Sequence, residues 1–574
     1  VNGSLAITSY VWRTDRELVL MKASNKDCEI PAAPVPPFSP SIRSNLLGKV
    51  GAARTYQNLL ASTYDEELFR FFATSEVCKV SIDEDGNKIC EESYPETKGI
   101  INFLSVSPDG NYLMTKAIEE PFSYLVPYTR FPHCNKIWDF NQGVSSPLLE
   151  QKIPLQEQIP SIHDAAKTGP REVRWVSSSE NTLFWVEAQD GGDPRTEVEI
   201  RDKLFTLSAP FSGTPTMLHS FTSRFHDCDW TNHNFAWMQE RCWKNRWSKV
   251  HKVSFSPSFI PTEVTTIFDR SYEDSYNDPG SIWVSKDNTA RFVAPVSNNN
   301  EILLDSPGAT PQGYLPFLDR FDTLNKTSVR LWRCSEGKYE RVEVILEDDG
   351  SAFITIRQSN EEQPNLWLHT QMETGEYKSF QITFFPDPYS WMKQIRQELV
   401  TYTRPDGVLL SGKLRLPENF TVGKDDPLPL LIWAYPREFT SEKAANQVKV
   451  TPSTFTTISS MSPIYWVTQG FAVLSDASFP IVSGGKSTME DVNNTFIPQL
   501  IANAETHVNE MVSRKIADPN RIAVGGHSYG AFMTANLLAH TNLFCAGIAR
   551  SGAYNRTLTP FGFQSEDRTL WESG

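Results

Sequence analysis

The feature that most constrains the fold is a change in hydrophobic pattern near residue 385, at Phe384-Phe-Pro-Asp-Pro-Tyr389. Residues 1–385 consist of short apolar segments separated by polar turns, with little helical periodicity, which is typical of β-strands. After residue 385, apolar strands alternate with helical segments, a pattern that predicts a parallel sheet covered by helices. We therefore expect two domains, residues 1–385 and residues 386–574.

A strand–turn–strand unit recurs loosely through the first of these regions. Its clearest turn is Ser107-Pro-Asp-Gly110, in which proline sets the first corner and glycine allows a positive φ. After a longer first gap, the units repeat at roughly 50–70 residues, close to the length of a four-stranded propeller blade. The pattern favours a β-propeller over the alternative, unrelated hairpins in one or two β-sandwiches. The units pair Tyr10–Asp15 with Leu18–Met21, Leu104–Gly110 with Tyr112–Met114, Val173–Val176 with Leu183–Val186, Asp229–Trp230 with Phe235–Trp237, Ile282–Val284 with Phe292–Val293, and Ile345–Leu346 with Phe353–Ile356.

The region after residue 385 contains the elements expected of an α/β fold. A hairpin is expected around Asp406-Gly407, and strands at Pro427–Trp433, Phe471–Leu474 and Ile522–Val524. Two helices are expected, at about Met489–Lys515 and Tyr529–His540. The first of them has an apolar face with spacings of three and four residues, made by Val492, Phe496, Leu500, Ala504, Val508 and Met511.

Composition excludes several classes of function. The chain has 54 Lys and Arg against 69 Asp and Glu, a formal net charge of −15, which disfavours binding to nucleic acid. Its 8 cysteines lack metal-ligand spacing, so we expect reduced thiols, no disulfide framework and no metal. No apolar stretch approaches the roughly 20 residues that span a bilayer, so we expect a soluble protein. Gly485-Lys486-Ser487 resembles the end of a phosphate-binding loop, but position 480 is Pro where that motif needs Gly, and no cofactor is expected.

The strongest chemical signal is Gly526-x-Ser528-x-Gly530, placed between an apolar strand and a helix. This is the context of a nucleophile elbow, whose crowded backbone requires glycine beside an exposed serine. Ser528 is therefore interpreted as a nucleophile rather than a structural serine. The backbone N–H of Tyr529 is the expected oxyanion donor, with the helix N-terminus adding partial positive charge. Tyr435, after the strand Pro427–Trp433, is either a second oxyanion donor or a loop tyrosine that packs its ring.

No histidine near Ser528 suits the role of general base. A residue next to the nucleophile points away from it, so His527 is expected to pack, and His540 lies a whole helix away. In this fold the triad residues follow the order Ser, Asp, His, and His540 is the sole histidine after Ser528. Asp567 is expected to be a solvated loop charge. We therefore expect the catalytic Asp and His to be absent from this chain.

Motifs along most of the chain resemble the prolyl oligopeptidase clan of serine peptidases, family S9, and most closely its glutamyl endopeptidase branch from plant plastids and bacteria. The stretches that carry the resemblance are Gly51–Leu60, Tyr64–Leu68, Pro121–Tyr128, Glu187–Arg195, Phe268–Asp274, Ala434–Phe439, Gly525–Met533 and Ala549–Arg556. The resemblance implies a β-propeller, here lacking its first blades, that caps a partial α/β-hydrolase domain, with the active site between them. It also implies an oxyanion role for Tyr435, a plastid or cytoplasmic location, and a chain that is an interior fragment.

The function that the resemblance implies is a serine endopeptidase that cleaves after Glu through an acyl-enzyme, with the propeller limiting entry to peptides or unfolded segments. Arginine can bind a glutamate carboxylate through two N–H donors. Arg556 is the first candidate, with Arg550 and Arg437 as alternatives, although Arg556 could instead pair with Glu566 or Asp567. Two other functions remain open: an acylaminoacyl-peptidase, other exopeptidase or esterase on the same scaffold, and an inactive binding protein. The sequence does not determine the oligomeric state.

Overall fold

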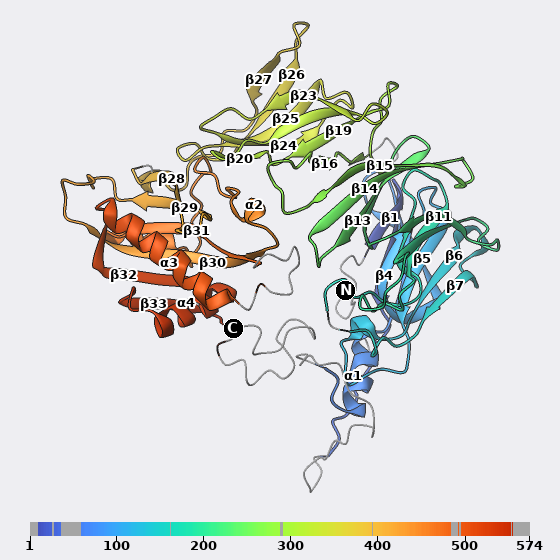
Figure 1. Cartoon of the computed structure of the whole chain (residues 1–574). Coiled ribbons are helices and arrows are strands. Elements are labelled where there is room, and N and C mark those ends of the chain that lie inside the picture. The colour runs from blue at the N-terminus through green and yellow to red at the C-terminus, as the bar shows by residue number, and fades with distance from the viewer. Residues whose placement is uncertain are drawn as a thin grey trace.

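The protein is described here from a computed structural model (Figure 1). The structure describes residues 10–25, 28–35, 59–160, 162–286, 291–392, 394–483, 492, 495–552 and 554.

The first part of the chain begins with a seven-stranded antiparallel sheet in the order β1-β2-β3-β4-β5-β6-β7. The long strand β4 belongs to two four-stranded units, because its residues up to Gly99 pair with β3 and those from Ile100 onward pair with β5. Helix α1 (Thr63–Ala73) precedes β3, and its N-cap Ser62 accepts a hydrogen bond from the Asp65 N–H. The strands are β1 (Tyr10–Thr14), β2 (Glu17–Ala23), β3 (Ser75–Ile82), β4 (Lys88–Val106), β5 (Tyr112–Ile118), β6 (His133–Asp139) and β7 (Pro147–Ile153).

Four further four-stranded antiparallel sheets follow in chain order. The first contains β8 (Arg171–Trp175), β9 (Thr182–Ala188), β10 (Asp202–Ser208) and β11 (Thr216–Phe221). The second contains β12 (Arg224–Trp230), β13 (Phe235–Cys242), β14 (Trp247–Phe255) and β15 (Pro261–Ser271). The third contains β16 (Ser281–Ile282), β19 (Glu301–Ser306), β22 (Phe317–Asp322) and β23 (Thr327–Arg333). The fourth contains β24 (Tyr339–Ile345), β25 (Ala352–Gln358), β26 (Asn365–Gln371) and β27 (Tyr377–Gln381).

These sheets form successive blades of a β-propeller rather than the faces of a sandwich. Figure 1 shows them one after another along an arc, from blue β4–β7 through green β13–β15 to yellow β24–β27. The turn at Ser107-Pro-Asp-Gly110 joins β4 to β5, and Gly110 has the positive φ, 74°, that the sequence predicts. In the predicted unit Ile282–Val284 and Phe292–Val293, the first strand is divided between two sheets: Ile282 pairs with Leu304 of β19, whereas Phe292 pairs with Lys286. Two small two-stranded sheets lie in the connections of this blade. One contains β17 (Ser285–Lys286) and β18 (Phe292–Val293), and the other contains β20 (Ala309–Thr310) and β21 (Gly313–Tyr314).

The second part of the chain contains a six-stranded sheet in the order β28-β29-β31-β30-β32-β33. β28 and β29 are antiparallel to their neighbours, whereas β31, β30, β32 and β33 run parallel. The sheet is therefore mixed at one edge and parallel in its remaining part. The strands are β28 (Arg396–Thr403), β29 (Leu409–Leu416), β30 (Leu428–Phe439), β31 (Ala472–Val482), β32 (Ala517–His527) and β33 (Ala546–Arg550). The described helices of this part are α2 (Glu442–Ala445), α3 (Phe496–Ser513) and α4 (Tyr529–His540). The described 3-10 turns of both parts are η1 (Tyr128–Arg130), η2 (Phe140–Gln142), η3 (Ser390–Met392) and η4 (Pro463–Gln469).

Three strands extend beyond the predicted segments, and one helix starts later. β30 continues past Trp433 to Phe439, because parallel pairing with β31 persists from Ala434 opposite Ala477 to Phe439 opposite Val482. β31 and β32 are likewise longer than Phe471–Leu474 and Ile522–Val524, since neighbouring strands satisfy their backbone groups. The helix predicted at Met489–Lys515 is described from Phe496, and it ends at Ser513, before Lys515 takes a positive φ of 58°. Helix α4 has the predicted bounds.

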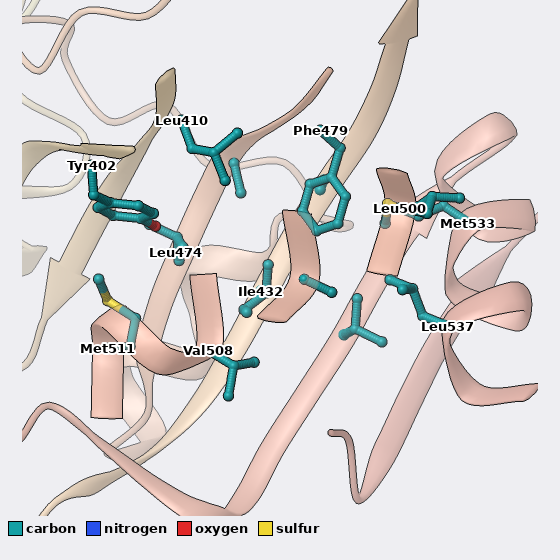
Figure 2. Close-up of a cluster of buried hydrophobic side chains, with 14 of the residues drawn as sticks. Tyr402, Leu410, Ile432, Leu474, Phe479, Leu500, Val508, Met511, Met533 and Leu537 are labelled. Carbon is teal, nitrogen blue, oxygen red and sulfur yellow. The ribbon is translucent and has the colours of Figure 1, made fainter. Parts of the chain in front are cut away.

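The core of this part lies between the sheet and helices α3 and α4 (Figure 2). Leu500, Val508 and Met511 of α3 and Met533 and Leu537 of α4 are buried against strand residues such as Ile432 and Leu474. The apolar face predicted from Val492 to Met511 is buried throughout. Within this core, His507 bonds the Tyr402 hydroxyl through Nδ1 at 2.5 Å and the Ser478 carbonyl through Nε2 at 2.8 Å. These bonds connect α3 to β28 and β31.

A loop after β15 contacts the segment around α2 and so joins the two parts of the chain. The Glu273 carboxylate accepts hydrogen bonds from the N–H and hydroxyl of Thr440 at 3.1 and 2.7 Å. Asp274 pairs with Lys443 at 3.0 Å, and the Tyr276 hydroxyl accepts from the Val448 N–H at 2.8 Å. The last propeller strand ends at Gln381 and the mixed sheet begins at Arg396, so we propose the domain boundary near residue 385.

No helix in the described part of the chain is long and apolar enough to cross a membrane. All eight cysteines are free thiols.

Candidate active site

Ser528 occupies a strained turn between β32 and α4. Its backbone has φ 56° and ψ −114°, a region that residues with a side chain rarely adopt. Hydrogen bonds hold it on both sides: its N–H donates to the Arg550 carbonyl at 2.9 Å, and its carbonyl accepts from the N–H of Ala531 at 3.0 Å. The residue is exposed at the carboxyl edge of the parallel strands. Strain held in this way at an exposed serine is the geometry of a nucleophile elbow.

Gly526 and Gly530 allow strand β30 to lie against this turn. A Cβ on Gly526 would lie 2.6 Å from the Ala434 carbonyl oxygen and 2.6 Å from the Gly530 carbonyl carbon. A Cβ on Gly530 would overlap the same Ala434 oxygen. Neither glycine has a positive φ, so both are required by close approach and not by backbone conformation.

Tyr529 and Tyr435 lie on the two elements that meet at this close approach, Tyr529 after the turn at Ser528 and Tyr435 on β30. Tyr529 is the first residue of α4, where backbone N–H groups lie at the positive end of the helix. Tyr435 lies within β30, opposite Ser478 of β31, so the expectation that it follows the end of the strand is wrong. Its side chain is 49% exposed, and its ring centroid lies 6.0 Å from that of Tyr529. The side chain of Tyr435 therefore lies beside the elbow residue Tyr529 rather than in the core.

A cleft of 240 Å³ opens beside the elbow at the carboxyl ends of β30 and β31. It contains His527, the neighbour of Ser528, but Ser528 itself does not line it. Its lining residues are Ser411, Trp433, Ala434, Tyr435, Arg437, Phe439, Ala445, Gln447, Lys449, Val450, Asp476, Ala477, Ser478, Phe479, Pro480 and His527.

The prediction that His527 packs in the protein is wrong, since the residue is exposed in this cleft. Strand β32 continues to the edge of the sheet and carries His527 with it, out of the core. His540 is the last residue of α4 and is also exposed, at the far end of the helix from Ser528.

Two cations and one carboxylate line the cleft. Arg437, on β30, is exposed, and its side chain makes no hydrogen bond or ion pair with the described residues. Lys449 is half-buried, with Nζ 3.5 Å from the Glu273 carbonyl oxygen and 4.6 Å from the centre of the Phe439 ring. Burial lowers the pKa of Lys449 and the charge of Arg437 lowers it further, whereas the carboxylates of Glu273 and Asp274 raise it. The Asp476 carboxylate lies 3.5 Å from Lys413 Nζ.

Sequence reasoning identified Arg437 but not Lys449 or Asp476. Neither missed residue belongs to a motif, although Asp476 has a positive φ, 50°, that marks it as an unusual strand residue. Arg550 lies on β33, half-buried, and its carbonyl accepts from the Ser528 N–H. Arg556, Glu566, Asp567 and the segment Gly485–Ser487 lie outside the described residues.

Comparison with known proteins finds a matching family model and curated relatives. Residues 499–566, which include the elbow and helices α3 and α4, match the model of the prolyl oligopeptidase family, Peptidase_S9. The chain carries a prolyl oligopeptidase family domain. It is 39% identical over 581 residues to "Probable glutamyl endopeptidase, chloroplastic" of Oryza sativa subsp. japonica, with 98% of this chain and 60% of the relative covered. It is 38% identical to the protein of the same name from Arabidopsis thaliana, with 98% and 59% covered. The chain thus spans about 60% of the length of these curated relatives.

A solved structure shares the fold of this chain. A Bacteroides ovatus protein, described as a candidate dipeptidyl aminopeptidase IV, superposes with a TM-score of 0.51 at 13% identity. The match covers 83% of this chain and 73% of that protein. Together with the sheets described above, it confirms the predicted fold class, a β-propeller followed by an α/β-hydrolase domain.

Proposed function

We propose that the protein is a serine peptidase in which Ser528 forms an acyl-enzyme. The observation that carries this proposal is the strained, exposed Ser528 held at the N-terminus of α4 beside a cleft. A general base takes the Ser528 proton while Oγ attacks the scissile carbonyl, and the leaving amine receives a proton as the peptide bond breaks. The oxyanion of the tetrahedral intermediate accepts hydrogen bonds from the Tyr529 N–H and the Tyr435 hydroxyl. Water then hydrolyses the ester.

We further propose that the protein is an endopeptidase with a preference for glutamate before the scissile bond. The names of the two curated relatives given above support this specificity, as does Arg437 in the cleft beside the elbow, whose side chain has no ion-pair partner among the described residues. Arg556 and Arg550 remain candidates for the same role, because both follow α4 in the chain near Ser528. The propeller would restrict entry to narrow peptides or unfolded segments. The chloroplastic relatives support a plastid location.

The test of this function is a set of internally quenched peptides in which only one residue changes between Glu, Gln and Leu. The intact protein should cleave the Glu peptide after that residue, as located by mass spectrometry, and should react with a fluorophosphonate probe. Ser528→Ala should abolish both the cleavage and the labelling. Release of only N-terminal acyl amino acids would instead indicate an exopeptidase, and labelling that persists in Ser528→Ala would contradict the assignment of the nucleophile.

A further inference from the structure

We infer that Arg437 and Lys449 together bind an acidic side chain of the peptide substrate inside the cleft. This inference rests on the proposed peptidase function and names the residues that determine its specificity. Lys449 belongs to no motif in the sequence. It lies in the segment after α2, whereas Arg437 lies on β30. The arrangement that points to this inference is two cations in one cleft beside the elbow, neither of which forms an ion pair with a described carboxylate.

The first line of support is the position of the two side chains. Arg437 lies two residues after Tyr435 on β30, so both side chains project from the same side of the strand. Both line the cleft that also contains His527, the residue before Ser528. A peptide whose carbonyl reaches Ser528 would therefore pass close to the Arg437 guanidinium. Lys449 faces the same space from the segment after α2.

The second line of support is electrostatic. Arg437 lies close enough to oppose the charge of Lys449, an effect that Glu273 and Asp274 partly offset, and the partial burial of Lys449 removes some of the water that would screen it. Like charges held together in this way cost free energy that a bound carboxylate would recover. Among the described residues, no Asp or Glu side chain forms an ion pair with either cation.

The acidic groups nearby are already engaged. Asp476 lines the cleft, but its carboxylate lies 3.5 Å from Lys413 Nζ. The Glu273 carboxylate accepts two hydrogen bonds from Thr440 and lies 3.3 Å from Arg246 Nε. The positive charge of the Arg437 and Lys449 pair is therefore available to a ligand.

The third line of support is that Lys449 is held in place before a ligand arrives. Its amine contacts the Phe439 ring face at 4.6 Å and the carbonyl of Glu273 at 3.5 Å. Glu273 belongs to the propeller loop that binds Thr440, so both parts of the chain position this amine. A fixed ammonium beside a planar guanidinium offers a carboxylate three charge-assisted N–H donors at low ordering cost.

The test separates binding from turnover. Ser528→Ala protein would be titrated with fluorescent peptides that contain Glu or Gln at the same position, each with a C-terminal amide or a free carboxylate. Arg437→Met and Lys449→Met, added singly to Ser528→Ala, should each weaken binding of the Glu peptide by about 10–100-fold and of the Gln peptide by less than about 3-fold. Lys449→Arg should retain most of the affinity. The exposed Lys424, which lies outside the cleft, provides a matched control, and Lys424→Met should change neither affinity.

Several outcomes would overturn the inference. Equal losses for Glu and Gln peptides would mean that the two residues support the cleft wall rather than bind a carboxylate. A selective loss in Arg550→Met or Arg556→Met, but not in Arg437→Met, would place the acidic side chain elsewhere. An effect confined to peptides with a free C-terminal carboxylate would show that the pair binds that group. The proposed function fails separately, if the intact wild-type protein cleaves none of the peptides or does not distinguish Glu from Gln.

Discussion

The carbonyl oxygen of Ala434 lies 2.6 Å from the position that a Cβ on Gly526 would occupy. This contact brings strand β30, which carries Tyr435 and Arg437, directly against the turn that carries Ser528. Ser528 and the cleft are therefore coupled through backbone atoms, which cannot move aside as a flexible side chain could.

Gly526→Ala should destabilise the protein by about 1–3 kcal/mol or more, because the added methyl group would overlap backbone on two sides. Urea denaturation would measure the change. Gly213→Ala is the matched control, since a Cβ there meets nothing within 4 Å and its φ is not positive. Equal stabilities for the two variants would show that the elbow is less tightly packed than described.

Ser528→Gly should abolish activity and raise the free energy of unfolding by about 1 kcal/mol, because glycine relieves the strain of φ 56°. Ser528→Ala should abolish activity without this gain, since alanine keeps the Cβ. Thermal denaturation of wild type and of both variants would measure these differences in stability. A Ser528→Ala protein as stabilised as the glycine variant would mean that the hydroxyl, and not the backbone, is the source of the strain.

Tyr435→Phe should lower kcat by about 10²–10³-fold with KM nearly unchanged, if its hydroxyl stabilises the oxyanion. Steady-state kinetics of the intact protein on its best peptide would measure both constants. A rise in KM alone would instead assign Tyr435 to substrate contact or packing.

The stability of the α/β-hydrolase domain should fall as the pH drops from about 6.5 toward 4, because burial lowers the pKa of His507 to about 4. The folded protein holds the His507 ring in its neutral form. The contribution of this ring to the free energy of unfolding is complete above the unfolded pKa of about 6.5 and is lost as the pH falls toward the folded pKa, a loss of about 1–3 kcal/mol. Denaturation between pH 4 and 7.5 should show a smaller pH slope for His507→Leu than for wild type.

Tyr402→Phe provides the control for this titration. It removes the hydrogen bond to His507 Nδ1 but leaves the buried imidazole in place, so it should lower stability while preserving most of the pH slope. His133 and His219, whose pKa values burial also lowers to about 4, would titrate unchanged in every variant. Equal slopes in wild type and His507→Leu would therefore rule out His507 as a contributor.

Much of the architecture followed from the sequence, because it depends on short-range patterns. Alternating strands and turns before residue 385 predicted the propeller blades, and the apolar face from Val492 to Met511 predicted the packing of α3. The glycines around Ser528 predicted a crowded turn, since only a close approach of backbone requires glycine at Gly526 and Gly530. These features need no knowledge of which distant segments meet.

The tertiary structure alone decided the composition of the cleft. β30 lies between β31 and β32 and is extended to Phe439 by pairing with β31, which moves Tyr435 from a loop into a strand. Strand β32 also extends beyond its predicted segment, and this extension exposes His527, which the sequence predicts to pack in the interior. Lys449 lines the same cleft as Arg437 from the segment after α2, which the propeller loop at Glu273 contacts. The local sequence pattern determines which residues form each helix and strand. Which charged side chains come together depends on strand pairing and segment contacts between residues far apart in the sequence, and a short stretch of sequence does not contain that information.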